Sequence, residues 1–328
     1  MTAGPLLSVR GLRVTFPGTA GPLVAVDGVD LDVRRGEVLG LVGESGSGKS
    51  VTLRAILRLV NPPGRVSGEI RWNGADLAAM TAAELRAVRG RQIAMVFQEP
   101  GAALNPVLTV GLQIEESLAT HFGLRGRAAR QRAAELLGMV GIADAPHRLD
   151  AYAHEFSGGM RQRVMLAIAL AAGPKLLLAD EPTTALDVTI QDQILKLMLR
   201  FRRELDMSVV LVTHDFSVVA QTCDRVAMLY AGRMMEIGSI ADVFRRPAHA
   251  YTSGLIGSVP TGHGARRPLT SIPGVPPILS DLPDGCCFAP RCDLATDICL
   301  AGRPALIEVA PDHRSACRHA DRVRAVVP

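Results

Sequence analysis

One stretch of the sequence has the residue types and spacing that bind phosphate groups. Residues 43–50 read GESGSGKS, after an apolar run of strand character at 37–42 and before a segment of helical periodicity at 51–60. The glycines allow the backbone amides to turn inward, and a helix N-terminus adds favourable partial charge. In such a loop Lys49 would reach the β- and γ-phosphates, and the Ser50 hydroxyl would hold Mg²⁺. A flexible surface loop is the alternative, but the flanking strand and helix favour a nucleoside triphosphate site.

A second candidate is an acidic pair that ends the apolar run at 176–179. Asp180 would stand at the carboxyl edge of a parallel sheet, where ligands bind in α/β folds. It suits Mg²⁺, through water, because this ion prefers few carboxylates and several waters. Glu181 could accept a proton from an attacking water. The alternative is a strand followed by an acidic cap, but beside a phosphate loop the pair predicts hydrolysis.

A third candidate opens the apolar helix predicted at 160–171. Ser157, Gly158 and Gly159 could form a second anion site at a helix N-terminus, although such a serine is usually only a cap. One ATP does not need two phosphate cradles in one chain. We therefore interpret this segment, 23 residues before Asp180, as a contact to the ATP of a second subunit.

The composition of the 328-residue chain suits a globular protein and argues against nucleic acid as a partner. Hydrophobic residues make up 48% and charged residues 21%, which predicts a substantial core. Aromatic residues are only 4% and the net charge is +4, so we read the basic run at 125–132 as a solvated helix face. We find neither a signal-peptide pattern nor an apolar run of about 18 residues, so we expect a cytosolic chain.

Strand and helix patterns alternate over most of the chain and predict a mainly parallel, doubly wound α/β core. The predicted strands lie at 6–16, 24–33, 37–42, 67–72, 93–97, 175–179, 208–213 and 225–230. The predicted helices lie at 51–60, 110–120, 128–139, 160–171, 188–205 and 216–223. Asn73-Gly74 predicts a tight turn. From 246 to 285 prolines and glycines predict a loop-rich linker into a small appendage that does not continue the sheet.

In order and spacing these segments resemble the ATP-binding subunit of an ABC transporter. The Walker A motif would be 43–50, the Walker B motif 176–181 and the signature 156–160, with Phe156 and Met160 where the family commonly has leucine and glutamine. Further matches are the Q-loop glutamine Gln98, the D-loop 185–187 and the switch histidine His214. The resemblance implies a P-loop NTPase core with an antiparallel β subdomain and a helical subdomain at about 99–155, together forming an ATPase domain at 1–245. Residues 246–328 would form a C-terminal extension.

The resemblance also implies roles for individual residues. Those that would contact ATP, here or in a dimer partner, are Phe16, Gly43, Ser45, Gly46, Gly48, Lys49, Ser50, Val51, Gln98, Ser157, Gly158, Gly159 and Asp187. Those implied in catalysis are Glu181, His214, Gln98 and Lys49, and those implied in Mg²⁺ binding are Ser50, Gln98 and Asp180. Phe16 would stack on adenine, although a phenylalanine that ends a strand is equally compatible with the core.

Finer similarity, over about residues 6–318, is to the oligopeptide/dipeptide importer ATPases. It lies in the segments 98–106, 160–163, 185–188, 247–252 and 272–274. The resemblance implies peptide import driven by ATP-dependent dimerisation of two cassettes at the cytoplasmic face of the cell membrane. The partners would be two permease subunits, an identical or homologous second ATPase and an extracytoplasmic substrate-binding protein. Related branches import nickel, haem or glutathione. Soluble ABC proteins that act on DNA or ribosomes usually carry two cassettes or a long coiled-coil insertion, which this chain lacks.

Five of the six cysteines lie near the end of the chain, and four of them have the spacing C-x5-C-x6-C-x17-C: Cys286, Cys292, Cys299 and Cys317. In a cytosolic chain such a group indicates metal before disulfide. Four thiolates can bind a [4Fe–4S] cluster or Zn²⁺, and the absence of C-x2-C pairs favours iron–sulfur, as does the resemblance. The same cysteines could also be unligated thiols or disulfides, and a redox sensor is a third function class. We interpret Cys223 and Cys287 as spare thiols.

Overall fold

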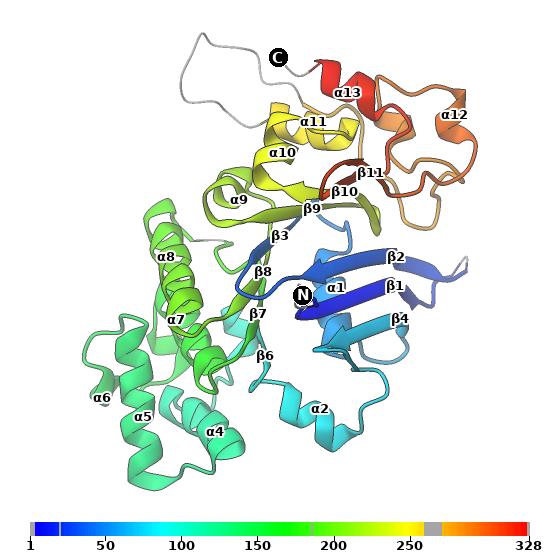
Figure 1. Cartoon of the computed structure of the whole chain (residues 1–328). Helices are drawn as coiled ribbons and strands as arrows, with labels where there is room; N and C mark the ends of the chain where they lie inside the picture. The colour runs from blue at the N-terminus through cyan, green and yellow to red at the C-terminus, as the bar shows by residue number, and fades with distance from the viewer. Residues whose placement is uncertain (1–3, 20, 185, 259–270, 327–328) are drawn as a thin grey trace. The chain divides into compact units, whose positions relative to one another are not determined.

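Figure 1 shows the computed structural model of the chain, which describes residues 4–19, 21–184, 186–258 and 271–326. The chain divides into two compact units. The first unit takes in the residues up to 78 and those from 212 onward, and the second comprises residues 79–211. No helix among the described residues is both long and apolar enough to cross a membrane.

The first unit contains an antiparallel sheet with the strand order β2-β1-β4-β5 (Figure 1). Its strands are β1 (Leu7–Phe16), β2 (Leu23–Val33), β4 (Arg65–Trp72) and β5 (Ala75–Asp76). In β2 the alternating residues Val29, Leu31 and Val33 are fully buried, as the period of a strand with one buried face requires. Asn73 and Gly74 both have positive φ and turn β4 into β5. The antiparallel subdomain and its tight turn are confirmed.

The first unit also holds the strand and helix that flank the phosphate loop, β3 (Val38–Val42) and α1 (Lys49–Ile56). All five residues of β3 are buried, and β3 pairs in parallel with β9 (Arg225–Tyr230). A parallel strand that is covered on both faces has a continuous apolar sequence, as β3 does. The helix is shorter than the predicted 51–60. It ends because Arg58 takes a left-handed φ of 53°, which lets the Leu59 amide bond the Arg54 carbonyl at 2.8 Å.

The second unit combines short strands with the helices of the predicted helical subdomain. Its strands and helices are α2 (Ala82–Val88), β6 (Ile93–Val96), α3 (Pro100–Ala103), α4 (Val110–Phe122), α5 (Gly126–Met139), α6 (Ala145–Arg148), η1 (Ala153–Glu155), α7 (Gly158–Leu170), β7 (Leu176–Asp180) and α8 (Val188–Glu204). Strands β6 and β7 pair in parallel, and α4 and α5 pack on each other and on α7. The arginines of the run 125–132 are exposed, as expected for a solvated face. Strand β8 (Ser208–Thr213) follows, and the second unit ends within it.

The rest of the first unit corrects the expectation that the C-terminal part leaves the sheet. Its elements are α9 (Phe216–Thr222), β9, β10 (Arg233–Ser239), α10 (Ile240–Arg245), α11 (Ala250–Gly257), η2 (Ala289–Arg291), α12 (Asp297–Leu300), β11 (Ile307–Ala310), β12 (His313–Ser315) and α13 (Ala320–Val326). Strand β10 forms a hairpin with β9, β12 pairs with β10, and β11 pairs with β12. The extension therefore continues the sheet at its edge. Helix α11 also lies in the segment predicted as loop, of which residues 259–270 lie outside the described residues.

A buried carboxylate explains why the extension docks on β10. Glu236 of β10 is fully buried, and it accepts hydrogen bonds from the amides of Ala248 and His249 at 2.7 and 3.0 Å. The ring Nε2 of His313 in β12 lies 2.6 Å from the same carboxylate. A buried charge is tolerated only when such partners satisfy it, so this residue ties β12 and the segment before α11 to the sheet.

Candidate functional site

The phosphate loop lies where the sequence predicts it, between β3 and α1, and two of its glycines are required by close packing. A Cβ atom on Gly43 would lie 2.0 Å from the carbonyl oxygen of Leu229, and one on Gly48 would lie 2.6 Å from that of Ala25. Gly48 has a left-handed φ of 98° and occupies the N-cap of α1, to which it brings no side chain. The first amides of a helix with such an end are available to an anion.

Lys49 turns back onto its own loop. Its Nζ donates to the carbonyl oxygens of Gly43 and Glu44 at 2.8 and 2.9 Å and lies 3.4 Å from Ser47 Oγ. The residue is only 5% exposed, and carbonyl oxygens satisfy its charge. The ammonium group thus lies against the loop, and its contact with bound phosphates stays a prediction.

The C-terminal extension contacts the same loop through Glu44. The sequence did not predict this contact. Arg291 forms an ion pair with Glu44 in which the shortest separation is 2.8 Å, and the Tyr251 hydroxyl accepts a hydrogen bond from the Glu44 amide at 2.9 Å. Burial works against the charge of Arg291, but bonds to Glu44 and to the Tyr230 hydroxyl outweigh it and raise the pKa of Arg291. No sequence motif signals a contact between residues 247 positions apart.

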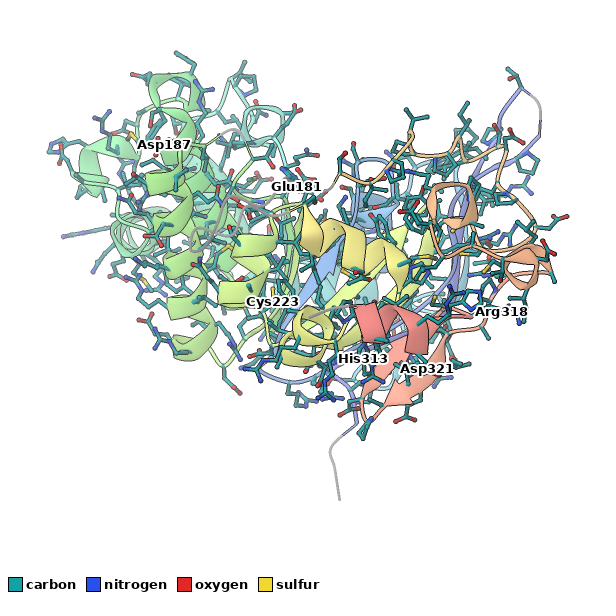
Figure 2. All side chains as sticks on the ribbon, turned by 90° about the horizontal axis from the view of Figure 1, so that it is seen from above. Glu181, Asp187, Cys223, His313, Arg318 and Asp321 are labelled. Atoms are coloured by element: carbon teal, nitrogen blue, oxygen red, sulfur yellow. The ribbon has the colours of Figure 1, made fainter. Side chains whose placement is uncertain are left out.

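In the second unit Asp180 ends β7, and Glu181, labelled in Figure 2, is the next residue. Asp180 is fully buried, and Glu181, the residue after the strand, takes a left-handed φ of 45°. Such a conformation costs about 1–3 kcal/mol and tends to persist at functional sites. Gln98 Nε2 donates to Glu181 Oε2 at 3.2 Å, and Thr184 Oγ1 donates to the same oxygen at 2.8 Å. The structure thus brings Gln98 and Glu181 together and adds Thr184, which sequence reasoning missed.

The residues predicted to serve a second subunit stand at two helix starts of the second unit. Ser157 is the N-cap of α7 and accepts a hydrogen bond from the Met160 amide. Asp187, labelled in Figure 2, is the N-cap of α8 and accepts a hydrogen bond from the Ile190 amide. A Cβ on Gly159 would lie 2.7 Å from Ile190 Cγ2, so the glycine also permits close packing on α8. Ser157, Gly158 and Asp187 are exposed. Ala185 of the predicted D-loop lies outside the described residues.

Two further predicted site residues stand at the ends of strands in the first unit. His214 is exposed and stands between β8 and α9, beside Asp215, which caps α9. Phe16 ends β1 and is half-buried next to Gly64, where an added Cβ would lie 2.7 Å from the phenyl Cε1. Adenine stacking by Phe16 therefore stays a prediction.

The four predicted metal ligands line one small cavity of the extension. Cys286, Cys292, Cys299 and Cys317 share its wall with residues of α11 and with His249 and His319. Burial raises the pKa of the Cys286, Cys292 and Cys317 thiols. Cys287 is directed elsewhere, with its Sγ 3.9 Å from the Tyr230 carbonyl oxygen, and Cys223 lies in the core at the end of α9. As the described side chains stand, no group of three or more His, Cys, Asp or Glu residues could hold a metal ion.

Comparison with known proteins decides the family. The model of the family described as ABC transporter matches residues 26–184, and that of the oligopeptide/dipeptide transporter C-terminal region matches residues 235–299. The dipeptide transport ATP-binding protein DppD of Escherichia coli (strain K12) is 47% identical over 315 residues, which cover 96% of each chain. The chain belongs to the ATP-binding subunits of ABC transporters. The oligopeptide transport ATP-binding protein OppD of Bacillus subtilis (strain 168) is 48% identical over 311 residues, 94% of this chain and 87% of the relative.

A solved structure supports the fold of this ABC ATPase. The ATP-binding cassette MJ0796, determined as a dimer in a post-hydrolysis state bound to ADP and Pi, is 30% identical with a TM-score of 0.64. The match covers 71% of this chain and 98% of that one. The ABC subunit described here therefore has the P-loop NTPase fold, and like its family it binds and hydrolyses ATP.

Proposed function

We propose that this ABC subunit powers the import of peptides. The observation that carries the proposal is the similarity over almost the full length to ATP-binding proteins named for dipeptide and oligopeptide transport, extension included. The cargo itself would be selected by permeases and a substrate-binding protein, so nickel, haem or glutathione are the alternatives.

The proposed chemistry assigns each residue one task on ATP. The amides of the Walker A loop and the Lys49 ammonium would bind the phosphates, and the Nζ of Lys49 lies beside the loop, 2.8 Å from the Gly43 carbonyl oxygen. Ser50 and the buried Asp180 offer the hydroxyl and carboxylate oxygens that suit Mg²⁺, which would neutralise phosphate charge when bound. Gln98 would contact the Mg²⁺ or the water, and His214 the γ-phosphate.

Glu181 would be the general base of the reaction. A base must hold its carboxylate in a fixed direction, and the donors Gln98 and Thr184 both contact Oε2 of Glu181. The water would lose its proton to Glu181 as its oxygen attacks the γ-phosphorus and the bond to ADP breaks. The products are ADP and inorganic phosphate, and the balance requires no further reactant.

We further propose that two cassettes close on ATP and that the second one supplies Ser157, Gly158, Gly159 and Asp187. The exposure of Ser157, Gly158 and Asp187 at two helix starts supports a contact to another chain. The related cassette MJ0796 is dimeric, which is in line with this assembly. Closure and reopening would drive two permease subunits at the cytoplasmic face of the membrane, with cargo delivered by a substrate-binding protein outside.

The proposed cargo is tested in the assembled transporter. The full chain is affinity-purified with its partners from detergent-solubilised native membranes, and ATP hydrolysis is measured with saturating dipeptide, tetrapeptide, Ni²⁺, haem or glutathione. We expect two permeases and a binding protein to copurify, and peptides to stimulate hydrolysis. Stimulation by Ni²⁺, haem or glutathione, with no response to peptides, would reject the peptide assignment.

We also propose that the four cysteines of the extension hold a [4Fe–4S] cluster with a structural role. The observation behind this choice of ligands is that all four thiols line one small cavity, whereas the Sγ of Cys287 lies 3.9 Å from the Tyr230 carbonyl oxygen. Four thiolates can bind such a cluster.

Metal analysis of anaerobically purified full-length protein tests this proposal. We expect about four irons and four acid-labile sulfides per chain, with the visible absorption of a cluster. Cys292→Ser should lose this content, whereas the matched control Cys287→Ser should keep it. One zinc per chain, or neither metal, would contradict the proposal.

A further inference from the structure

The C-terminal extension holds the Walker A loop through one arginine. Arg291 ends η2, and its guanidinium makes two parallel bonds to Glu44, from Nη1 to Oε2 at 2.8 Å and from Nη2 to Oε1 at 3.1 Å. The arginine side chain is 7% exposed and the glutamate side chain 21%. Two-point bonds of this kind fix direction as well as distance, and shielding from water strengthens them.

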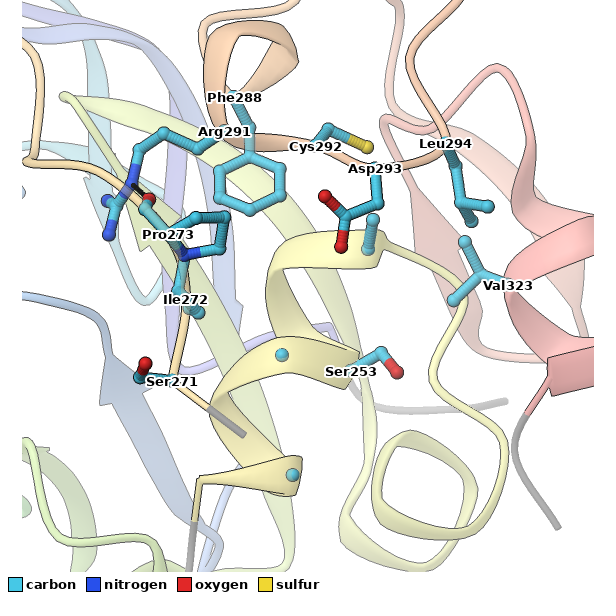
Figure 3. Close-up of a pocket in the computed structure, with 13 residues that line it drawn as sticks. Ser253, Ser271, Ile272, Pro273, Phe288, Arg291, Cys292, Asp293, Leu294 and Val323 are labelled. Atoms are coloured by element: carbon cyan, nitrogen blue, oxygen red, sulfur yellow. Dashed lines mark hydrogen bonds between the residues drawn. The ribbon is translucent and has the colours of Figure 1, made fainter. Parts of the chain in front are cut away.

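Hydrogen bonds and ring contacts together set the position of Arg291. Its Nε donates to the Pro273 carbonyl at 2.8 Å, and Nη1 donates to the Tyr230 hydroxyl at 3.1 Å. Its Cζ lies 5.8 Å from the ring centroid of Tyr230 and 6.0 Å from that of Phe288. A cavity of about 380 Å³ lies beside the side chain, lined also by Phe288, Pro273 and helix α11 (Figure 3). A lysine carries the charge but has no planar fork, so it could not make the same set of bonds.

Glu44 is held at three points, two of which come from the extension. Arg291 binds its carboxylate, the buried Tyr251 accepts from its amide at 2.9 Å, and Lys49 donates to its carbonyl at 2.9 Å. Tyr251 is itself fixed by ring contacts to Tyr230 and Phe288, with centroids 4.7 and 5.3 Å apart. The residue that follows the first glycine of the loop therefore cannot move without breaking bonds to the extension.

We propose that Arg291 is a positioning residue for ATP binding: it holds and neutralises Glu44 and so fixes the entry of the Walker A loop. A carboxylate in a loop that binds phosphates opposes binding unless a cation is paired with it. Removal of the arginine would leave that carboxylate unpaired and would release the loop at one of its three points. The inference rests on the ATP-binding activity of the family and is independent of the cargo and of the cysteine site.

The test measures ATP affinity and kinetics in the full-length protein and its complex. Arg291→Gln should raise the Kd and the KM for ATP about tenfold, equivalent to about 1.4 kcal/mol, with little change in kcat at saturating ATP. The double variant Arg291→Gln/Glu44→Gln should regain part of this affinity, because the unpaired carboxylate is gone although the loop still lacks the bonds of the fork. A lower kcat with unchanged KM, or a double variant as weak as Arg291→Gln, would overturn the proposal.

Two further variants separate positioning from folding. Arg303→Gln is the matched control, because Arg303 also lies in the extension and pairs with Asp27 at 3.2 Å, away from the loop. It should leave ATP affinity unchanged, and an equal loss would overturn the proposal. Arg291→Lys keeps the charge without the fork and should bind ATP more weakly than the wild type even if Arg291→Gln does not fold. Wild-type affinity in Arg291→Lys would also overturn it.

Discussion

At the scale of single residues, two carboxylates of this ATPase have directions that are set by neighbouring side chains. Glu181 leaves its strand through a left-handed backbone, and two donors converge on its Oε2. Glu44 is fixed in a different way, by the fork of Arg291. In each case an acidic side chain is given a direction that the strand or loop alone would not impose.

The motif residues could be predicted from the sequence because their chemistry is local in the chain. Lys49 and its glycines occupy consecutive positions, and β3 and α1 position them without help from distant segments. Arg291 and Thr184 could not be predicted in the same way. Arg291 bonds Glu44, a residue 247 positions earlier in the chain. Thr184 is a common residue type, and nothing in the sequence announces the unusual φ of Glu181, the residue that it bonds.

At the scale of elements, alanine substitutions at two glycines of the helical subdomain can test how its helices pack. Gly111 of α4 lies against Leu149, where a Cβ would stand 2.7 Å from the carbonyl oxygen, whereas an added Cβ on exposed Gly138 of α5 meets nothing within 4 Å. We expect Gly111→Ala to destabilise the protein by roughly 1–3 kcal/mol through overpacking. Gly138→Ala should stabilise it by roughly 0.5–1 kcal/mol, because alanine restricts the unfolded chain.

Thermal or urea unfolding measures the free energy of unfolding of each variant relative to the wild type. Equal stabilities, or a stable Gly111→Ala variant, would mean that α4 does not approach Leu149 as described.

Most elements could be predicted because their apolar patterns are long and periodic. Helix α8 and the buried strands β3 and β7 lie within one residue of their predicted bounds. The predicted end of α1 was wrong because Arg58, which has a left-handed φ, ends the helix before its apolar pattern ends. The hairpin β9–β10 was missed because its turn is Ala231-Gly232, which lacks the asparagine or aspartate typical of such turns.

At the scale of the whole molecule, the extension is part of the sheet and not an appendage beside it. Strands β11 and β12 have only four and three residues, which is too short for an alternation to predict a strand. Their place depends on Glu236 and His313, a buried pair that no local pattern reveals. In the same unit Arg291 of the extension bonds Glu44 of the Walker A loop, and we propose that it positions this loop for ATP.

The central claim is that this chain hydrolyses ATP with Glu181 as the base, and the most direct test is one turnover of the assembled complex. The complex carrying Glu181→Gln is mixed with labelled ATP, and both bound ATP and released phosphate are followed. A glutamine keeps the shape of the side chain but cannot accept the proton. We therefore predict ATP binding near wild-type affinity, with phosphate release slowed by about 100-fold or more. Release at the wild-type rate would contradict the mechanism proposed here.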